Sequence, residues 1–312
     1  MSTKNIAVDV KMGKGMGAAG GAAAQKRKRS QAVYVWQRFK KNKIAMLGLF
    51  IIFCLIALAL LADVIAPGDG VFPGYDIQDL SNTLQYPSFQ NIMGTDNFGR
   101  DIFSRIAHGS RVSLQVGFVV VSISLVAGVA LGALSGFYSG IIDNSIMRSI
   151  DILLALPGVL LAISIAAALG AGLTSVIIAV GVGAIPNYAR IVRASVLSLR
   201  EQEFIEAARS IGANDARIVL RHILPNCAAP IIVQATMGMA SAILAAAGLS
   251  FIGLGIQLPT PEWGAMLSQG RAFIRTFYPM VVFPGLAIAF VIFGLNMLGD
   301  GLRDALDPRL KK

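Results

Sequence analysis

Five runs without a charged side chain, each long enough to cross a lipid bilayer, constrain the fold of this chain more than any other feature. They are Ile44–Ala62, Val112–Ile142, Ile152–Ala189, His222–Pro261 and Thr276–Gly299. A helix rises about 1.5 Å per residue and the hydrocarbon core is about 30 Å thick, so roughly 20 apolar residues make one crossing. The composition agrees, since 55% of the residues are hydrophobic and only 14% are charged. The sequence therefore predicts an all-α integral membrane protein.

Two of the runs have to be divided before the spans can be counted. Ile152–Ala189 is too long for one helix and long enough for two, with Gly170–Gly172 as the turn between them. His222–Pro261 is better read as one span followed by an outer segment near Gly253–Trp263. This division predicts six transmembrane helices, at residues 44–62, 112–136, 152–170, 173–189, 230–250 and 278–298.

The basic residues predict the orientation, because cytoplasmic loops carry an excess of Lys and Arg. With six spans both termini share one side, which holds 22 of the 27 basic residues: 11 in residues 1–43, one in 138–151, six in 190–221 and four in 300–312. We therefore expect a multi-pass protein of a bacterial-type cytoplasmic membrane, with both termini in the cytoplasm. The net charge of +10 then reflects topology, and no nucleic-acid partner is expected.

Residues 1–34 are predicted to be a basic cytoplasmic tail without fixed structure, because they are rich in Gly, Ala, Lys and Arg. The tail lacks an apolar core, so it does not read as a cleavable signal peptide. Lys26–Arg29 and Lys40–Lys43 are expected to contact lipid headgroups near the first span. The predicted transmembrane domain is residues 35–312, with an outer loop at 63–111 and a cytoplasmic loop at 190–229.

The spans contain no ionisable side chain of the kind that ion-driven transporters keep within the bilayer. Both histidines, His108 and His222, fall in predicted loops, so the spans offer no base for catalysis. Cys54 and Cys227 lie far apart, and neither a metal site nor a catalytic site is expected. If the chain moves a solute against a gradient, its energy should come from another subunit. An ion-driven secondary transporter or a channel remains the alternative.

Small residues recur within the spans, as at Gly128 and Gly132 and along Ala235–Gly248. This spacing lets helices approach closely. Ordinary helix packing is the favoured interpretation, and a subunit interface lining a pore is the other.

The segment Glu206–Pro225 reads as a polar helix–turn–helix between apolar spans. Phe204, Ala208 and Ile211 recur at i, i+4 and i+7, which places them on one helical face. Gly212 is expected to end the first helix in a left-handed conformation.

The rest of this segment predicts a second short helix and a surface. Asn214 or Asp215 can cap that helix, and Pro225 is expected to end or redirect it before the fifth span. Ala207 and Ala208 would leave a flat patch beside the charge of Glu206. A protein partner and an anionic lipid surface are both possible binders of such an element.

The order Glu206-Ala207-Ala208, then Gly212, then Leu224-Pro225 resembles the EAA motif of ATP-binding-cassette importer permeases. One position departs from the motif, because His222 stands where Ile is usual. In that family the motif forms a coupling helix that docks in a groove of the ATPase subunit. The resemblance implies that the ATPase-coupling residues are Glu206, Ala207, Ala208, Ile211, Gly212, Arg217, His222, Leu224 and Pro225.

Four further motifs resemble the dipeptide/oligopeptide permease subfamily, and the last two resemble its C-type second permease. They are Gly94–Arg105, Asp143–Pro157, Pro259–Gly264 and Gly299–Pro308. The resemblance covers most of residues 35–312 and implies the type I importer architecture. It also implies a heterodimer with a second homologous permease, two cytosolic ATPases that hold ATP and Mg, and an extracytoplasmic solute-binding protein. The implied function is that of a permease subunit for dipeptides or oligopeptides, with no cofactor in this chain.

Each of the outer motifs has two interpretations. Asp96, Arg100, Asp101 and Arg105 either dock the binding protein or belong to a surface helix that Asp96 caps, with an apolar stripe of Ile102, Phe103 and Ile106. Pro259, Pro261, Glu262 and Trp263 form either a rigid turn with Trp263 anchored at the membrane interface, or a lid near the outer mouth of a pore. At the inner face, Arg148 is expected to pair with Asp143 and Asp151, with gating as the alternative.

Overall fold

The computed structural model describes residues 31–70 and 73–306, and these residues form helices without any β-strand. The α-helices are α1 (Gln31–Lys41), α2 (Lys43–Leu60), α3 (Ala62–Ile65), α4 (Ile102–Tyr138), α5 (Gly140–Ala155), α6 (Gly158–Leu169), α7 (Leu173–Arg200), α8 (Glu203–Ser210), α9 (Asp215–Arg217), α10 (Ala228–Phe251), α11 (Trp263–Gly270) and α12 (Pro279–Leu306). The short turns are η1 (Leu80–Asn82), η2 (Ile218–Ile223), η3 (Leu224–Cys227) and η4 (Arg271–Phe273).

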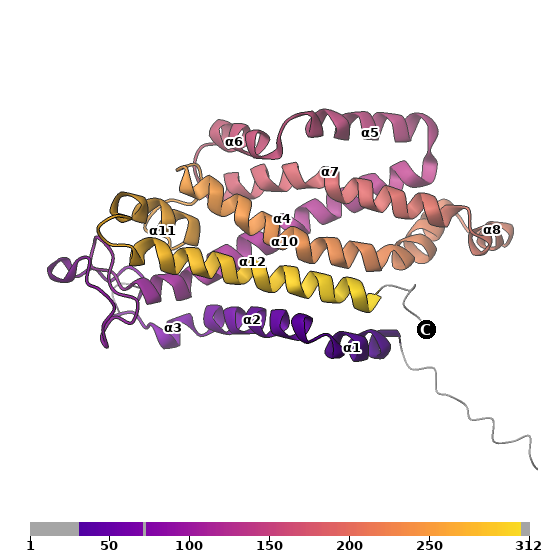
Figure 1. Cartoon of the computed structure of the whole chain (residues 1–312). Helices are drawn as coiled ribbons and strands as arrows, with labels where there is room; N and C mark the ends of the chain where they lie inside the picture. Colours follow the sequence, from indigo (N-terminus) through magenta and orange to yellow (C-terminus); the bar gives the residue numbers. More distant parts are fainter. Residues whose placement is uncertain (1–30, 71–72, 307–312) are drawn as a thin grey trace, which may run out of the picture.

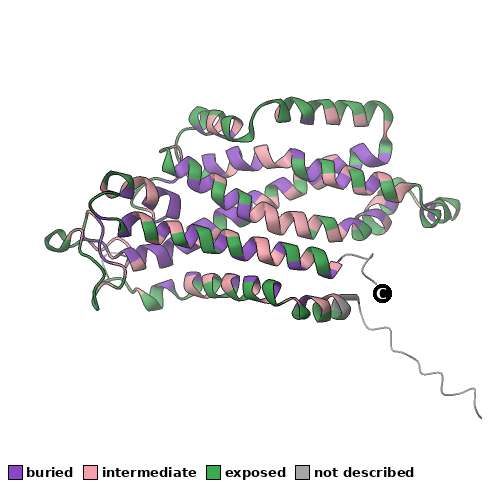
Figure 2. Cartoon of the chain, in the orientation of Figure 1, coloured by how far each residue is buried: buried purple, intermediate pink, exposed green. Residues whose placement is uncertain are grey.

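The long helices α2, α4, α7, α10 and α12 run side by side as a bundle with two distinct ends (Figure 1). One end carries α8 and α1 and is called the α8 end. The opposite end carries α3, α11 and the loop residues 66–70 and 73–101, and is called the α11 end. Exposed residues dominate α5, α6 and α8 (Figure 2). Large apolar side chains such as Phe50, Phe53 and Phe118 are exposed on the spanning helices, as expected where hydrocarbon surrounds a protein.

The helix lengths confirm the predicted membrane fold with one difference in the third span. Five helices are long and apolar enough to cross, and a sixth span results if α5 and α6 are taken together. These two helices meet at an angle of 87°. The break falls at Leu156 and Pro157, where Leu156 is extended. Proline lacks an N–H and disfavours the helical conformation of the residue before it. The prediction of one transmembrane helix at 152–170 is therefore wrong, because the helix is interrupted at Leu156 and Pro157.

Helix α4 begins ten residues before the predicted span of 112–136, and it replaces the predicted surface helix. Its N-cap is Asp101, whose carboxylate accepts a bond from the Ser104 amide at 2.7 Å, so Asp96 does not cap it. Ile102 and Ile106 are buried in the core. Two residues of the predicted apolar stripe, Ile102 and Ile106, therefore pack against the protein and not along the membrane surface, whereas Phe103 is half-buried.

Helices α4 and α7 form the most extensive helix pair of the bundle, and glycines allow their close approach. A Cβ atom on Gly132 would lie 2.4 Å from the Ala189 carbonyl oxygen, and one on Gly128 would lie 2.4 Å from the Tyr188 Cβ. At these positions the small residues therefore serve packing within the chain, which confirms the favoured interpretation.

The bounds of α1 and α7 differ from the predicted boundaries of the tail and the cytoplasmic loop. Helix α1 begins at Gln31, inside the predicted tail of residues 1–34, and the first 30 residues lie outside the described part. Helix α7 continues to Arg200, so residues 190–200 of the predicted loop at 190–229 belong to this helix.

Candidate functional site

The helix α8 is fixed to the bundle by two apolar side chains. Ile205 and Ala208, three residues apart, are buried in a cluster with Ile218, Ile223 and Phe137. Phe204 and Ile211 are exposed whereas Ala208 is buried, so the three residues predicted to share one helical face differ in exposure. The flat patch predicted at Ala207 and Ala208 is wrong for the same reason, since only Ala207 is exposed. A buried face with Phe204 and one with Ile205 would both fit the helical period. Ile205 is the buried one because Ile218 and Ile223 pack against its side of the helix.

The turn after α8 has the predicted conformation. Gly212 adopts a φ of 82°, in the left-handed region that residues other than glycine rarely adopt. The Ala213 amide donates to the Ala208 carbonyl at 3.1 Å, which closes the end of the helix. Of the two candidate caps, Asn214 is the one used, and it accepts from the Arg217 amide at 2.9 Å.

Pro225 was expected to end or redirect the helical path, and of these two alternatives the first is wrong. The path continues from Asp215 to Phe251 through the π-helical turn η2 and the 3-10 turn η3. The Leu224 amide bonds to the Val219 carbonyl, five residues earlier. The missing N–H of Pro225 falls within these irregular turns, so no regular helical bond is lost.

Fewer residues of the segment Glu206–Pro225 are exposed than the motif suggests. Phe204, Ala207 and Ile211 are exposed at i, i+3 and i+7, and they are called the α8 face. Ile211 is 86% exposed, and Leu220 on η2 is 67% exposed. The remaining motif residues divide by burial: Glu206, Gly212, Arg217 and Pro225 are exposed, His222 and Leu224 are half-buried, and Ala208 is buried.

Arginines of α7 connect this end to the turn between α4 and α5. The Arg193 guanidinium binds both oxygens of Asp143, at 2.6 and 2.7 Å. Arg200 donates to the Gly136 and Phe137 carbonyls and to the Ser139 hydroxyl. The α7 arginines thus tie α7 to α4 and α5, which the sequence did not indicate because the partners are 50 to 64 residues apart.

The predicted pairing of Arg148 with the aspartates of its own segment is wrong. Asp143 pairs with Arg193, and Asp151 pairs with Arg190 at 2.5 Å. Helix α7 is a neighbour of α5, so its side chains reach these carboxylates.

At the α11 end, three of the four predicted docking residues form a buried network. The Asp96 carboxylate accepts from the amides of Phe98 and Arg100 at 2.8 and 3.0 Å, and from the Arg100 Nε at 2.8 Å. The Arg105 Nε lies 3.8 Å from the same carboxylate. Asp96, Arg100 and Arg105 are each at most 3% exposed. Their charges therefore hold the loop together, and Asp101 alone of the four is partly exposed.

The motif Pro259–Gly264 packs against α4 and α10. Glu262 is buried and caps α11, its two oxygens accepting from the Gly264 and Ala265 amides at 2.9 and 2.8 Å. Burial raises the pKa of the Glu262 carboxyl, and these amide bonds oppose the rise. Trp263 is fully buried and its indole N–H donates to the Ile106 carbonyl at 3.2 Å, so it is not an interface anchor.

Two family models match the chain. The model described as "Binding-protein-dependent transport system inner membrane component" matches residues 128–312. The model of the "N-terminal TM domain of oligopeptide transport permease C" matches residues 30–87.

Curated relatives match over most of their length. The dipeptide transport system permease protein DppC of Alkalihalophilus pseudofirmus is 50% identical over 88% of this chain and 89% of the relative. The glutathione transport system permease protein GsiD of Escherichia coli O157:H7 is 48% identical over 88% of this chain and 90% of the relative. Among solved structures, an inward-facing MetNI methionine ABC transporter matches with a TM-score of 0.54 and 20% identity, covering 65% of this chain and 97% of that one. This last likeness shows the shared fold.

Proposed function

The chain belongs to the family of binding-protein-dependent transport inner membrane components, as an importer permease of the oligopeptide C type, and within it we propose the following role. The protein forms half of the translocation pathway of an ATP-driven importer for dipeptides or longer peptides. The relatives named for dipeptide and glutathione transport support short peptides as the substrate class. Membership of this family argues against the alternative hypothesis of an ion-driven secondary transporter or a channel.

The observation that carries the coupling role is the α8 face. Phe204, Ala207 and Ile211 are exposed on a short helix whose opposite side, Ile205 and Ala208, is anchored in the bundle. Exposed apolar residues on a rigid element are typical of protein docking sites. The family works with ATPase subunits, so the α8 face is the proposed contact with one of them.

The proposed assembly contains this chain, a second homologous permease, two cytosolic ATPases and an extracytoplasmic solute-binding protein. ATP and Mg would be held by the ATPases, and this chain would need no cofactor of its own. The distribution of basic residues supports placing the α8 end and both termini in the cytoplasm. The binding protein would then meet the α11 end.

In the proposed mechanism, closure of the ATPases on ATP moves α8 and the bundle changes from an inward-open to an outward-open state. Arg193 and Arg200 support this transmission, because they tie α7, directly before α8, to the α4–α5 turn. The bent pair α5 and α6 follows that turn and would move with it. Such coupling requires the two states to bind the partner with different affinity.

The test substitutes two residues of the motif, Glu206 and Gly212, and compares them with Glu203, an exposed glutamate on the same helix outside the motif. Glu206→Lys should lower ATPase co-purification and peptide uptake by at least roughly tenfold if a charge contact of about 1.5 kcal/mol or more is reversed. Gly212→Val should do the same, because valine disfavours the left-handed conformation. Glu203→Lys, one turn earlier and outside the motif, is the matched control and should retain both activities. Unchanged assembly and uptake in the Glu206 and Gly212 variants would exclude the coupling role.

A further inference from the structure

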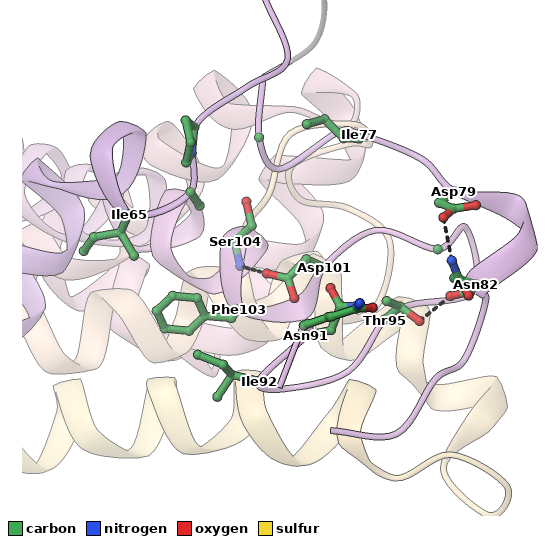
Figure 3. Close-up of a pocket in the computed structure, with 15 residues that line it drawn as sticks. Ile65, Ile77, Asp79, Asn82, Asn91, Ile92, Thr95, Asp101, Phe103 and Ser104 are labelled. Carbon is green, nitrogen blue, oxygen red and sulfur yellow. Dashed lines mark hydrogen bonds between the residues drawn. The ribbon is translucent and has the colours of Figure 1, made fainter. Parts of the chain in front are cut away.

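A pocket of about 610 Å³ lies at the α11 end, between the end of α3, the loop that follows it and the first turn of α4 (Figure 3). Its size falls in the range of sites that bind small molecules. Apolar side chains make part of its wall, among them Ile65, Ile77, Ile92 and Phe103. The pocket is separate from the α8 face, which lies at the other end of the bundle.

Two oxygen atoms in the wall of this pocket are buried and have no hydrogen-bond partner within the part of the chain that the structure describes. They are the Asp101 Oδ1 and the Ser104 Oγ. The other Asp101 oxygen accepts from the Ser104 amide, so the two side chains are held next to each other (Figure 3). Ser104 is only 3% exposed. A buried acceptor without a donor costs free energy that a ligand with N–H groups would recover.

All charged side chains that the structure places in the lining are acidic. Among residues 31–70 and 73–306, Asp79 and Asp101 line the pocket and no Lys, Arg or His does. The Asp79 carboxylate already accepts from the Ser81 and Asn82 side chains, at 2.5 and 2.7 Å, so Asp101 is the carboxylate left to pair. Burial raises the pKa of the Asp101 carboxyl, as expected for a carboxylate without a neighbouring cation.

A metal ion is a poorer fit than an organic cation. In residues 31–70 and 73–306 there is no group of three or more His, Cys, Asp or Glu that could hold a metal. The isoleucines and Phe103 of the wall suit the carbon atoms of an organic ligand.

We propose that this pocket binds a primary ammonium group carried on a short apolar body. The ammonium donates to the Asp101 Oδ1 and the Ser104 Oγ, and residues such as Ile92 and Phe103 contact the carbon atoms. Two sources carry this chemistry: a small free amine, and a lysine side chain of a protein docked at the α11 end. Binding here is independent of the ATPase contact and goes beyond the proposed function.

The first experiment measures binding of n-butylammonium to the full chain by calorimetry, in nanodiscs of phosphatidylcholine, a lipid without a primary amine. Neutral n-butanol is the comparison ligand. Butylammonium should bind saturably and at least roughly tenfold more tightly, as expected for hydrogen bonds to a charged group. Equal affinity of the two ligands, or no binding of butylammonium, overturns the proposal.

Variants of the chain test the two acceptors. Asp101→Asn removes the charge but keeps a good helix cap, and it should weaken butylammonium binding by at least roughly tenfold. Ser104→Ala should weaken it roughly threefold or more, since it removes one neutral acceptor. Asp79→Asn is the matched control and should change the affinity less than either. Unchanged affinity in the Asp101 variant overturns the proposal.

A second arm identifies the source of the ammonium. If the source is a lysine of the solute-binding protein, Asp101→Asn also lowers the affinity of that protein for the assembled transporter. If the source is a free amine, that affinity is unchanged while butylammonium binding is lost. A chain that assembles with its ATPases and transports normally but binds no butylammonium refutes the pocket and leaves the proposed function intact.

Discussion

The two ends of the bundle differ in which side chains they bury: charged ones at the α11 end and mostly apolar ones at the α8 end. At the α11 end Asp96, Arg100, Arg105 and Glu262 are buried, and most of their polar atoms have partners within the chain. At the α8 end the buried side chains are mostly apolar, as in the cluster around Ile205, and apolar side chains are also exposed on the α8 face. The α11 end thus pairs most of its buried charges within the chain, whereas the α8 end exposes apolar side chains on a short helix.

This difference has a physical consequence for how each end responds to change. Buried charges that lose a partner are costly, so the α11 end should be sensitive in stability. Exposed apolar residues contribute little to the stability of the isolated chain. Substitutions on the α8 face should therefore weaken binding to the ATPase more than they lower the free energy of unfolding. Substitutions at the two ends should therefore separate stability from association.

The largest effect is expected for Asp96→Ala. Arg100 and Arg105 would remain buried without their shared carboxylate, which should lower the free energy of unfolding by about 3–5 kcal/mol. Thermal unfolding in detergent measures it. The control is Asp151→Asn, which breaks an exposed pair with Arg190 and should cost less than about 1 kcal/mol. Similar losses in both variants would show that burial at the α11 end is not what matters.

The next effect concerns the α4–α7 contact that joins the two ends. Gly132→Val places a side chain where even a Cβ would lie 2.4 Å from the Ala189 carbonyl, and overpacking should cost about 1–3 kcal/mol of stability. Gly183→Ala, on α7, meets no atom within 4 Å and should be neutral or slightly stabilising. The same unfolding measurement decides, and a fully stable Gly132 variant would contradict the close packing of α4 on α7.

The parts of the fold that depend on local chemistry could be predicted from the sequence. The spans follow from charge-free runs, and the turn at Gly212 and the cap at Asn214 follow from residues that have few conformational alternatives. Pro157 is also a local signal for the break between α5 and α6, and its effect on Leu156 was available from the sequence.

The parts that depend on distant residues could not be predicted. The spacing along α8 fits a buried face with Ile205 as well as one with Phe204, and only packing against Ile218 and Ile223 selects the first. The pairing of Asp143 with Arg193 joins residues 50 positions apart, and no spacing rule links them. The acidic pocket likewise forms from segments that meet only in the folded chain.

A smaller effect is expected at Asp101, the partly exposed acidic residue that caps α4 at the α11 end. Burial raises the pKa of Asp101 above its ordinary value of 3.8, so the folded state binds the proton more tightly than the unfolded state. The wild type should therefore lose stability as the pH rises from about 3.8 through the folded pKa. Asp101→Asn keeps the cap and removes this loss, so its stability at pH 7.5 should equal or exceed that of the wild type by less than about 1 kcal/mol. Unfolding temperatures measured from pH 4 to pH 8 test the slope, and a slope retained in the variant would assign it to another group.

The smallest effect on stability, with the sharpest consequence for assembly, is expected at Ile211. Because this side chain is 86% exposed, Ile211→Ser should change the free energy of unfolding by no more than about 0.5 kcal/mol. ATPase co-purification should fall about tenfold, equivalent to about 1.4 kcal/mol, if Ile211 is an anchor of the contact. Ile205→Ala, on the buried side of the same helix, should instead have its main effect on stability and lower the free energy of unfolding by about 2–5 kcal/mol. If Ile211→Ser retained full ATPase binding, the apolar α8 face would not be the contact, and the contrast between the two ends would lose its functional meaning.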